Sequence, residues 1–172
     1  MTSSSQADDR LRASVGASTR DTLRAGSSAG PLEACDCVLY PRTEEEVVAA
    51  LRFAEAHRVA IVPYGGGTAV SGGLEPSAED MRAAALSGRI ALHLGLLNRV
   101  LSVNVVDLTV VAQPGVLGPE LEEALRPHGL TARFFPQSFQ KSSIGGWVAT
   151  RAGGKCKPRF DRLDFRTTFA CS

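Results

Sequence analysis

Residues 63–73 read Pro-Tyr-Gly-Gly-Gly-Thr-Ala-Val-Ser-Gly-Gly, and they follow a short apolar run, Val-Ala-Ile-Val, at 59–62. The apolar run predicts a buried strand that ends at Pro63, and the stretch after it is too rich in glycine for the interior of a helix or strand. Glycine allows positive φ and a close backbone approach, and successive N–H groups in such a turn form a concave site for an anion, typically phosphate. The glycines alone are equally compatible with a turn that holds no ligand.

Two familiar phosphate-binding loops do not fit this stretch. A P-loop ends in Gly-Lys-Ser/Thr, whereas Gly67 is followed by Thr68 and Ala69, with no lysine. A dinucleotide-binding fingerprint requires glycine at the sixth position counted from Gly65, where this chain has Val70. The loop therefore belongs to neither class.

Helical patterns lie on both sides of the loop. Thr43, followed three residues later by Glu46, forms a capping-box pattern, and apolar residues at helical spacing continue to about His57. A second helix is predicted from Gly118, because the proline that follows is well placed in a first helical turn and an apolar face comes after it. The polar residues 75–88 are predicted to form a surface excursion.

Three strands are predicted over residues 90–94, 101–106 and 109–113, with Asp107 at the turn between the last two. His93, on the first of them, is interpreted as a core or edge histidine with satisfied hydrogen bonds. Helices and strands do not alternate as regularly as a doubly wound parallel sheet requires. The sequence therefore predicts an α+β fold.

A second strip rich in glycine and hydroxyl groups lies between residues 136 and 154. It opens with Pro-Gln-Ser-Phe and continues from Ser142 as Ser-Ser-Ile-Gly-Gly-Trp-Val-Ala-Thr-Arg-Ala-Gly-Gly. The two serines predict the start of a helix whose free N–H groups and positive dipole end suit an anion, and Trp147 is expected to pack inside. Two such strips facing one another would suit a long, flat cofactor that carries phosphate.

Composition excludes several classes of protein. The chain has 172 residues, 44% of them hydrophobic, and its 19 basic and 18 acidic residues leave a net charge of +1, so no nucleic-acid partner is expected. No apolar run is long enough for a membrane span and no secretory signal is recognisable, so the expected location is cytoplasmic. The four cysteines and three histidines match no ligand spacing, and no metal site is expected.

Four motifs, in this order and spacing, resemble the FAD-binding domain of the vanillyl-alcohol oxidase/para-cresol methylhydroxylase (PCMH-type, FAD-linked oxidase) superfamily. They are residues 63–73, Leu-Asn-Arg-Val at 97–100, Val-Ala-Gln-Pro-Gly-Val at 111–116 and the strip 136–154. Within the superfamily, Pro-Gln-Ser-Phe and Gly-Gly-Trp-Val-Ala-Thr-Arg-Ala-Gly are most similar to the alkyldihydroxyacetonephosphate synthase branch. The glycolate and D-lactate dehydrogenase branch usually has asparagine where Trp147 stands.

The resemblance implies a PCMH-type FAD-binding fold, with its first subdomain complete and its second only begun, and FAD as the cofactor. Some members attach FAD covalently through a histidine in the first loop, but this loop has Thr68 instead, so non-covalent FAD is expected. The implied cofactor-binding residues fall into three groups: Tyr64, Gly65, Gly66, Gly67, Thr68, Ala69 and Val70 around the pyrophosphate; Pro136, Gln137, Ser138, Ser142 and Ser143 along the cofactor; and Thr150, Arg151, Ala152 and Gly153 at the approach to the flavin ring. No catalytic residue is assigned.

The resemblance covers residues 36–154. Residues 1–35, rich in Ser, Ala, Gly and Arg, are predicted to be a flexible N-terminal arm. After Gly154 the family continues with further strands and a substrate domain, whereas residues 155–172 are basic and lack apolar periodicity. We expect a non-family tail there, in a chain that is C-terminally truncated or frame-shifted.

Three functions remain open at this stage. The resemblance favours a parent enzyme that exchanges the acyl group of acyl-dihydroxyacetone phosphate for a fatty alcohol, a step of ether lipid synthesis. The alternative is an FAD-linked dehydrogenase of 2-hydroxy acids such as D-lactate or glycolate. Either parent would act on a small-molecule or lipid substrate. A third interpretation is an inactive fragment, because the residues that select a substrate lie in a domain that this chain lacks.

Overall fold

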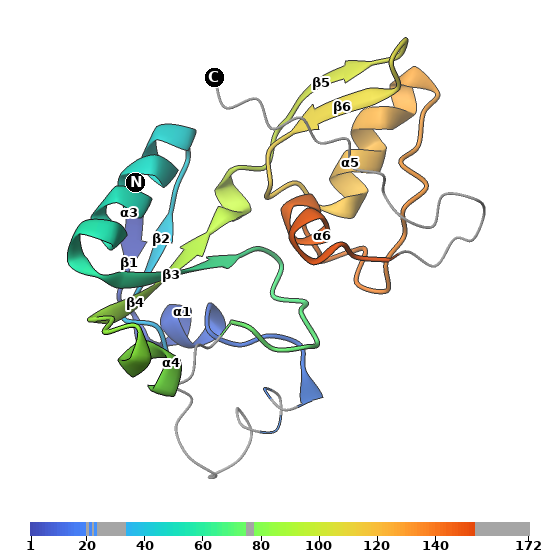
Figure 1. Cartoon of the computed structure of the whole chain (residues 1–172). Helices are drawn as coiled ribbons and strands as arrows, with labels where there is room; N and C mark the ends of the chain where they lie inside the picture. Colours follow the sequence, from blue (N-terminus) through green and yellow to red (C-terminus); the bar gives the residue numbers. More distant parts are fainter. Residues whose placement is uncertain (20, 22, 24–33, 75–77, 154–172) are drawn as a thin grey trace.

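The computed structural model describes residues 1–19, 21, 23, 34–74 and 78–153, and Figure 1 shows them as two units side by side. One unit is a four-stranded sheet with α3 beside it, and the other contains the β5–β6 hairpin, α5 and α6. This mixture of helices and strands agrees with the predicted α+β class. The segment expected to form a non-family tail, residues 155–172, lies outside the described residues.

The sheet has the strand order β1-β2-β4-β3. Its strands are β1 (Thr2–Ser4), β2 (Cys37–Tyr40), β3 (Val59–Tyr64) and β4 (Gly88–His93). Strands β2 and β3 both run parallel to the central β4, whereas β1 pairs antiparallel with β2.

Strand β3 does not end at Pro63, as the sequence analysis predicted, but continues through Tyr64. Pro63 pairs with Leu92 of β4, and the strand lies at the edge of the sheet. An edge strand needs hydrogen-bond donors on one side only, so a proline, which has no N–H, can face away from its neighbour. The extra residue places Tyr64 at the last position of the strand.

The first predicted helix and its cap are confirmed by α3 (Glu44–His57). Its N-cap residue is Thr43, whose hydroxyl accepts a hydrogen bond from the Glu46 N–H at 3.3 Å. The Glu46 carboxylate accepts from the Arg42 N–H at 2.7 Å, one residue before the N-cap. The reciprocal half of the capping box is thus displaced by one residue, but both bonds still satisfy backbone groups at the start of the helix.

Side chains of the sheet alternate between two buried faces, as the period of a strand requires. Leu39 and Leu92 pack with Ala50 of α3 on one face. Val38 and Ala91 pack on the other face with residues of the N-terminal segment. The core of this unit therefore has two layers, one on each side of the sheet.

The described N-terminal residues differ from the predicted flexible arm. They form β1 and a short helix, α1 (Ala7–Arg12). The Ser14 hydroxyl accepts from the Cys35 N–H at 2.8 Å, and the Arg10 guanidinium donates to the Cys35 carbonyl oxygen at 2.6 Å. Polar composition indicated disorder because it offers little apolar surface to bury. Specific hydrogen bonds to a distant backbone position hold this segment instead.

The second unit confirms the predicted hairpin and the two later helices. Its elements are β5 (Val100–Asn104), β6 (Thr109–Ala112), α5 (Gly118–Leu125) and α6 (Ile144–Thr150). Its core consists of five buried residues, Val116, Leu121, Leu125, Phe134 and Trp147. Trp147 is therefore packed inside, as predicted.

A short helix, α4 (Ala78–Ala83), lies within the segment predicted to be a surface excursion. The predicted turn at Asp107 is present: the Asn104 side-chain oxygen accepts from the Val106 and Asp107 N–H groups at 2.9 and 3.0 Å. A backbone hydrogen bond of 2.8 Å from the Gly115 N–H, between β6 and α5, to the Leu97 carbonyl oxygen joins the second unit to the segment that follows β4.

Candidate functional site

The carboxyl ends of β2, β4 and β3 lie next to one another, and the glycine-rich loop begins where β3 ends. Ligands of open sheets with parallel strands bind at this edge, outside the carboxyl ends of the strands. Gly67 takes positive φ (64°), and a Cβ atom built on it would collide with the Tyr64 hydroxyl. The loop therefore turns back over the last residue of its own strand, which only glycine permits at this position.

The two glycine-rich strips contact each other. A Cβ atom on Gly66 would overlap the carbonyl oxygen of Lys141, and one on Gly65 would overlap the hydroxyl oxygen of Ser143. No side chain fits between the strips at either position. The structure therefore brings the predicted residues Gly65, Gly66 and Ser143 together across the two units.

The backbone N–H groups of residues 66–70 donate no hydrogen bond to any described residue. The opposite side of the same loop is held in place, because the Ala69 carbonyl oxygen accepts from the Ala17 N–H at 2.9 Å. A turn with consecutive unpaired N–H groups is a binding surface for an anion, typically phosphate. The donor set of this loop thus fits a phosphate-bearing ligand.

The second strip is shaped by its own side chains. The Ser142 hydroxyl donates to the Ser138 carbonyl oxygen at 2.9 Å and accepts from the Trp147 indole N–H at 2.7 Å. Ser143 is the N-cap of α6, and its hydroxyl accepts from the Gly146 N–H at 3.4 Å. Both serine hydroxyls are thus used in hydrogen bonds within this strip. The indole hydrogen bond gives Trp147 a role beyond packing that its position in the sequence did not indicate.

The predicted site residues of the second strip are spread along its length. Pro136 is buried and Gln137 is exposed. Thr150 and Arg151 lie at the opposite end of α6 from Ser143, and the seven residues of that helix span about 10 Å at about 1.5 Å per residue. Arg151 has positive φ (48°) and ends the helix, while the Thr150 hydroxyl donates to the Gly146 carbonyl oxygen at 2.8 Å.

Three aromatic side chains lie in a row at the carboxyl ends of β2, β4 and β3. The His93 ring centroid is 5.0 Å from those of both Tyr40 and Tyr64. Burial lowers the pKa of His93 below its ordinary value and raises the pKa of Tyr64, so both side chains are neutral near pH 7. The His93 Nδ1 accepts from the Gly95 N–H at 3.2 Å, which agrees with the prediction of a satisfied histidine. Its place between the two tyrosines was not predicted.

A protein-family model described as "FAD binding domain" matches residues 35–164. The chain belongs to this family of FAD-binding domains. The match starts at Cys35, which ties the N-terminal segment to the sheet, and includes both glycine-rich strips. FAD is thus the cofactor of this family, as the resemblance implied, and nothing in the family match indicates covalent attachment.

The names of proteins similar to this FAD-binding domain are those of enzymes that act on small-molecule substrates. An alkyldihydroxyacetonephosphate synthase of Caenorhabditis elegans is 36% identical over 129 residues, 75% of this chain and 21% of that protein. A mitochondrial D-lactate dehydrogenase [cytochrome] of Arabidopsis thaliana is also 36% identical over 129 residues, 74% of this chain and 21% of that protein. A solved structure of an alkyldihydroxyacetonephosphate synthase has a TM-score of 0.79 and 30% identity, and it covers 88% of this chain and 27% of its own.

The FAD-binding domain therefore spans about a fifth of the length of these curated relatives. In the described ranges, none of the helices combines the length and apolar character needed to cross a membrane. The loop geometry fits the cofactor of the family, because FAD carries a pyrophosphate and the N–H groups of residues 66–70, in a turn, donate to no described acceptor.

Proposed function

We propose that the chain binds the pyrophosphate of FAD through the backbone N–H groups of residues 66–70, in the turn that Tyr64 and Gly65 open. The observation that carries this proposal is the turn itself. Its five consecutive N–H groups meet no described acceptor, while Gly66 lies directly against the Lys141 carbonyl oxygen. A loop whose backbone is held in place by contacts on one side, and whose N–H groups are free of described acceptors on the other, is pre-organised for an anion.

The rest of the cofactor would extend along the second strip. Ser142 and Ser143 precede α6 at its N-terminal end, and together with Pro136, Gln137 and Ser138 they would contact the middle of the cofactor. Thr150, Arg151, Ala152 and Gly153 would line the approach to the flavin ring. The length of α6, about 10 Å, supports this division, because FAD is an extended molecule whose ring lies well away from its pyrophosphate. When bound, the flavin supplies the electron-accepting ring.

For the enzyme activity associated with this domain we propose the reaction of the alkyldihydroxyacetonephosphate synthases to which this chain is similar. In it the oxygen of a fatty alcohol replaces the acyloxy group of an acyl-dihydroxyacetone phosphate, and the fatty acid leaves. Trp147 supports this choice, since the hydroxy-acid dehydrogenase branch usually has asparagine at that position. The second candidate is oxidation of a 2-hydroxy acid, favoured by equal identity to a D-lactate dehydrogenase.

Titration with FAD tests the binding proposal. Trp147 is the only tryptophan of the chain and lies in α6, so quenching of its fluorescence should report FAD binding. Gly66→Ala should weaken binding at least about tenfold, because the new methyl group displaces either the loop or the Lys141 backbone. Acid precipitation of the complex should release the flavin, since Thr68 cannot form the histidyl bond found in some relatives.

Gly146→Ala is the matched control for Gly66→Ala. A Cβ atom on Gly146 has the Ser143 hydroxyl oxygen at 3.5 Å as its neighbour, which is ordinary contact, so FAD affinity should change less than about twofold. Equal affinity of Gly66→Ala and the unaltered chain would contradict the proposed pyrophosphate site.

A second experiment separates the candidate reactions. The flavin-loaded chain is mixed with D-lactate, or with an acyl-dihydroxyacetone phosphate and a long-chain alcohol. An alkyl product, identified by mass spectrometry, supports the synthase. Bleaching of the flavin absorbance by D-lactate supports the dehydrogenase. The absence of both reactions in a chain that binds FAD supports the third interpretation, a binding domain without catalysis of its own.

A further inference from the structure

The row formed by Tyr40, His93 and Tyr64 crosses three neighbouring strands at the same level. Tyr64 and His93 are direct partners in the pairing of β3 with β4. Tyr40 follows Leu39, which pairs with Leu92, so it is next in the register of β2 with β4. All three are the last residues of their strands and have His93 in the middle. The row therefore marks the carboxyl edge of the sheet.

The central ring of the row is fixed from several sides. The two tyrosine rings lie on either side of His93, each with its centroid 5.0 Å away and tilted by 34° or 37°. The Gly95 N–H donates to Nδ1 at 3.2 Å, so the neutral imidazole carries its proton on Nε2. A Cβ atom on Gly95 would lie 2.7 Å from the His93 ring, so the chain passes directly against it.

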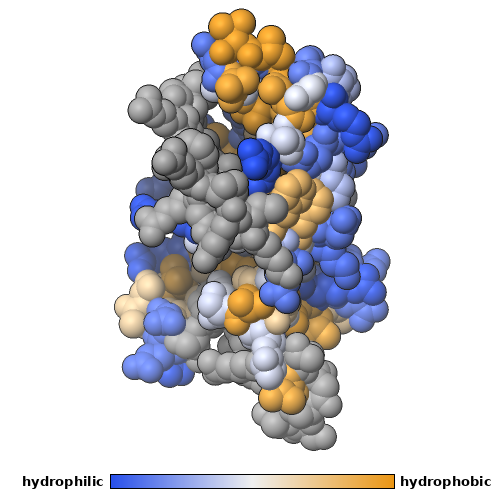
Figure 2. Space-filling model, turned by 90° about the vertical axis from the view of Figure 1, so that its right-hand side faces the viewer, coloured by the Kyte–Doolittle hydropathy of each residue, from blue (hydrophilic) through white to orange (hydrophobic). Residues whose placement is uncertain are grey.

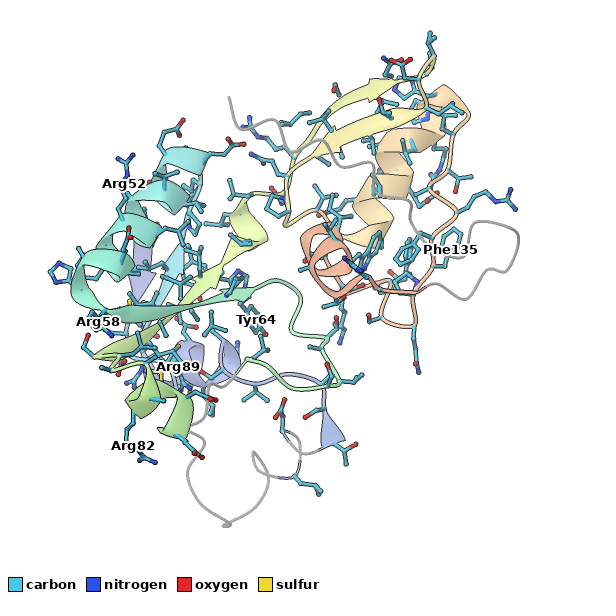
Figure 3. All side chains as sticks on the ribbon, in the orientation of Figure 1. Arg52, Arg58, Tyr64, Arg82, Arg89 and Phe135 are labelled. Carbon is cyan, nitrogen blue, oxygen red and sulfur yellow. The ribbon has the colours of Figure 1, made fainter. Side chains whose placement is uncertain are left out.

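The Tyr64 ring connects this row to the glycine-rich loop. Figure 3 labels Tyr64 between the end of β3 and the loop that follows it. Its hydroxyl occupies the position beside Gly67 that a Cβ atom would otherwise take. Gly67 is the second of the five residues, 66–70, whose N–H groups donate to no described acceptor. The orientation of one phenol ring therefore fixes how closely the turn can approach the sheet.

We propose that His93 is a positioning residue for the anion-binding turn: it holds the Tyr64 ring in the orientation in which the hydroxyl end of that ring supports Gly67. The inference rests on the proposed FAD-binding function of residues 66–70 and adds the residue that sets the shape of the turn. His93 itself contacts the ring of Tyr64 and the Gly95 backbone rather than the turn, so its effect on the ligand must pass through Tyr64.

Four variants of the full chain test this route: His93→Ala, Tyr64→Leu, their combination, and His93→Phe, which restores a ring between the two tyrosines. His57→Ala is the matched control, because the His57 ring also lies against an aromatic ring, that of Phe53, with centroids 4.4 Å apart, but on the exposed face of α3. Two quantities are measured in each variant: FAD affinity, and the NMR chemical shifts of the amides of residues 66–70.

We expect His93→Ala to weaken FAD binding about 3- to 10-fold, the range that the loss of one aromatic pair corresponds to. The double variant should bind no more weakly than Tyr64→Leu alone, because both changes act on the same ring. His93→Phe should recover most of the affinity, and His57→Ala should leave it unchanged. The amide shifts of residues 66–70 should move in His93→Ala and return in His93→Phe.

Unchanged amide shifts at residues 66–70 in His93→Ala would overturn the positioning role, as would losses of affinity that simply add in the double variant. The NMR readout needs no ligand. If the unaltered chain binds no FAD but its loop amides still respond to His93→Ala, the proposed function fails while the positioning role stands. If the chain binds FAD but the loop amide shifts do not change in His93→Ala, the proposed function stands and the positioning role fails.

Discussion

At the scale of single residues, the hydrogen bond between Trp147 and Ser142 stabilises the second glycine-rich strip. The indole N–H of Trp147 donates to the Ser142 hydroxyl at 2.7 Å, and both residues are buried. Trp147→Phe keeps a packed ring but leaves the hydroxyl without this donor, so we expect a loss of about 1–2 kcal/mol in the free energy of unfolding. Urea unfolding followed by circular dichroism measures it, since the variant has no tryptophan fluorescence.

Ser142→Ala is the companion variant, because it removes the other partner. The two substitutions together should cost less than the sum of their separate effects, since a hydrogen bond can be lost only once. Strictly additive losses would show that the Trp147 effect comes from packing alone.

The buried His93 should make the free energy of unfolding depend on pH. Burial lowers its pKa in the folded chain below the ordinary value of 6.5, and Nδ1 must stay unprotonated to accept from Gly95. Between the lowered pKa and 6.5 the unfolded chain binds more protons than the folded one. The free energy of unfolding should therefore decrease as pH falls through 6.5 and level off below the folded pKa.

His93→Asn should reduce this slope, because its side-chain oxygen can accept from Gly95 in place of Nδ1 but does not titrate. His57→Asn serves as the control and should keep the slope. The measurement is urea unfolding at half-unit steps from about pH 5 to about pH 8. A slope that survives in His93→Asn would contradict the assignment.

Helix α3 shows at the scale of elements why some features were predictable. Its cap depends on Thr43 and on the next three residues, so the bond is encoded locally. Thr43→Ala should lower the free energy of unfolding by about 1 kcal/mol, as the loss of an N-cap hydroxyl does in other helices. Thr43→Ser should restore most of it, and thermal unfolding compares the three proteins. No difference between alanine and serine would mean that the cap is not supported by the hydroxyl.

Features that depend on distant residues escaped the sequence analysis. The place of Pro63 inside a strand follows from the edge position of β3, which only the order β1-β2-β4-β3 determines. The N-terminal segment is held by hydrogen bonds of Arg10 and Ser14 with Cys35. The polar composition of the segment does not indicate these bonds. Local periodicity likewise identified the strand of His93, but its place between Tyr40 and Tyr64 required the pairing of three strands.

In the candidate site, too, local features were predictable and features that depend on distant residues were not. Both strips were identified from glycine and serine content, and the contact of Gly66 with the Lys141 backbone confirms that they meet. The hydrogen-bond partners of individual side chains were less predictable than the contact between the strips. The Ser142 hydroxyl is used within the protein, by Ser138 and Trp147. A pattern of small residues indicates where backbones approach, whereas the partners of each hydroxyl depend on the fold.

An apolar surface at the hairpin is the main feature at the scale of the whole molecule. Figure 2 shows it as a group of hydrophobic side chains at the top of the view, where Figure 1 places the β5–β6 hairpin. Its most exposed members are Val106 (87%) and Leu108 (71%), with Leu101, Val105 and Val111 each about half exposed. Contiguous apolar surface of this kind promotes association, and a net charge of +1 opposes it little.

We therefore expect the chain to self-associate through this hairpin as its concentration rises. Val106→Lys with Leu108→Lys should shift the association to at least about tenfold higher concentration, because both side chains lie at the exposed turn and their replacement removes no core contact. Sedimentation velocity over a dilution series measures the effect. The control is Leu51→Lys, at a half-exposed apolar position on α3 in the other unit, which should leave association unchanged. If the α3 variant dissociates the chain and the hairpin variant does not, the associating surface lies on the first unit instead.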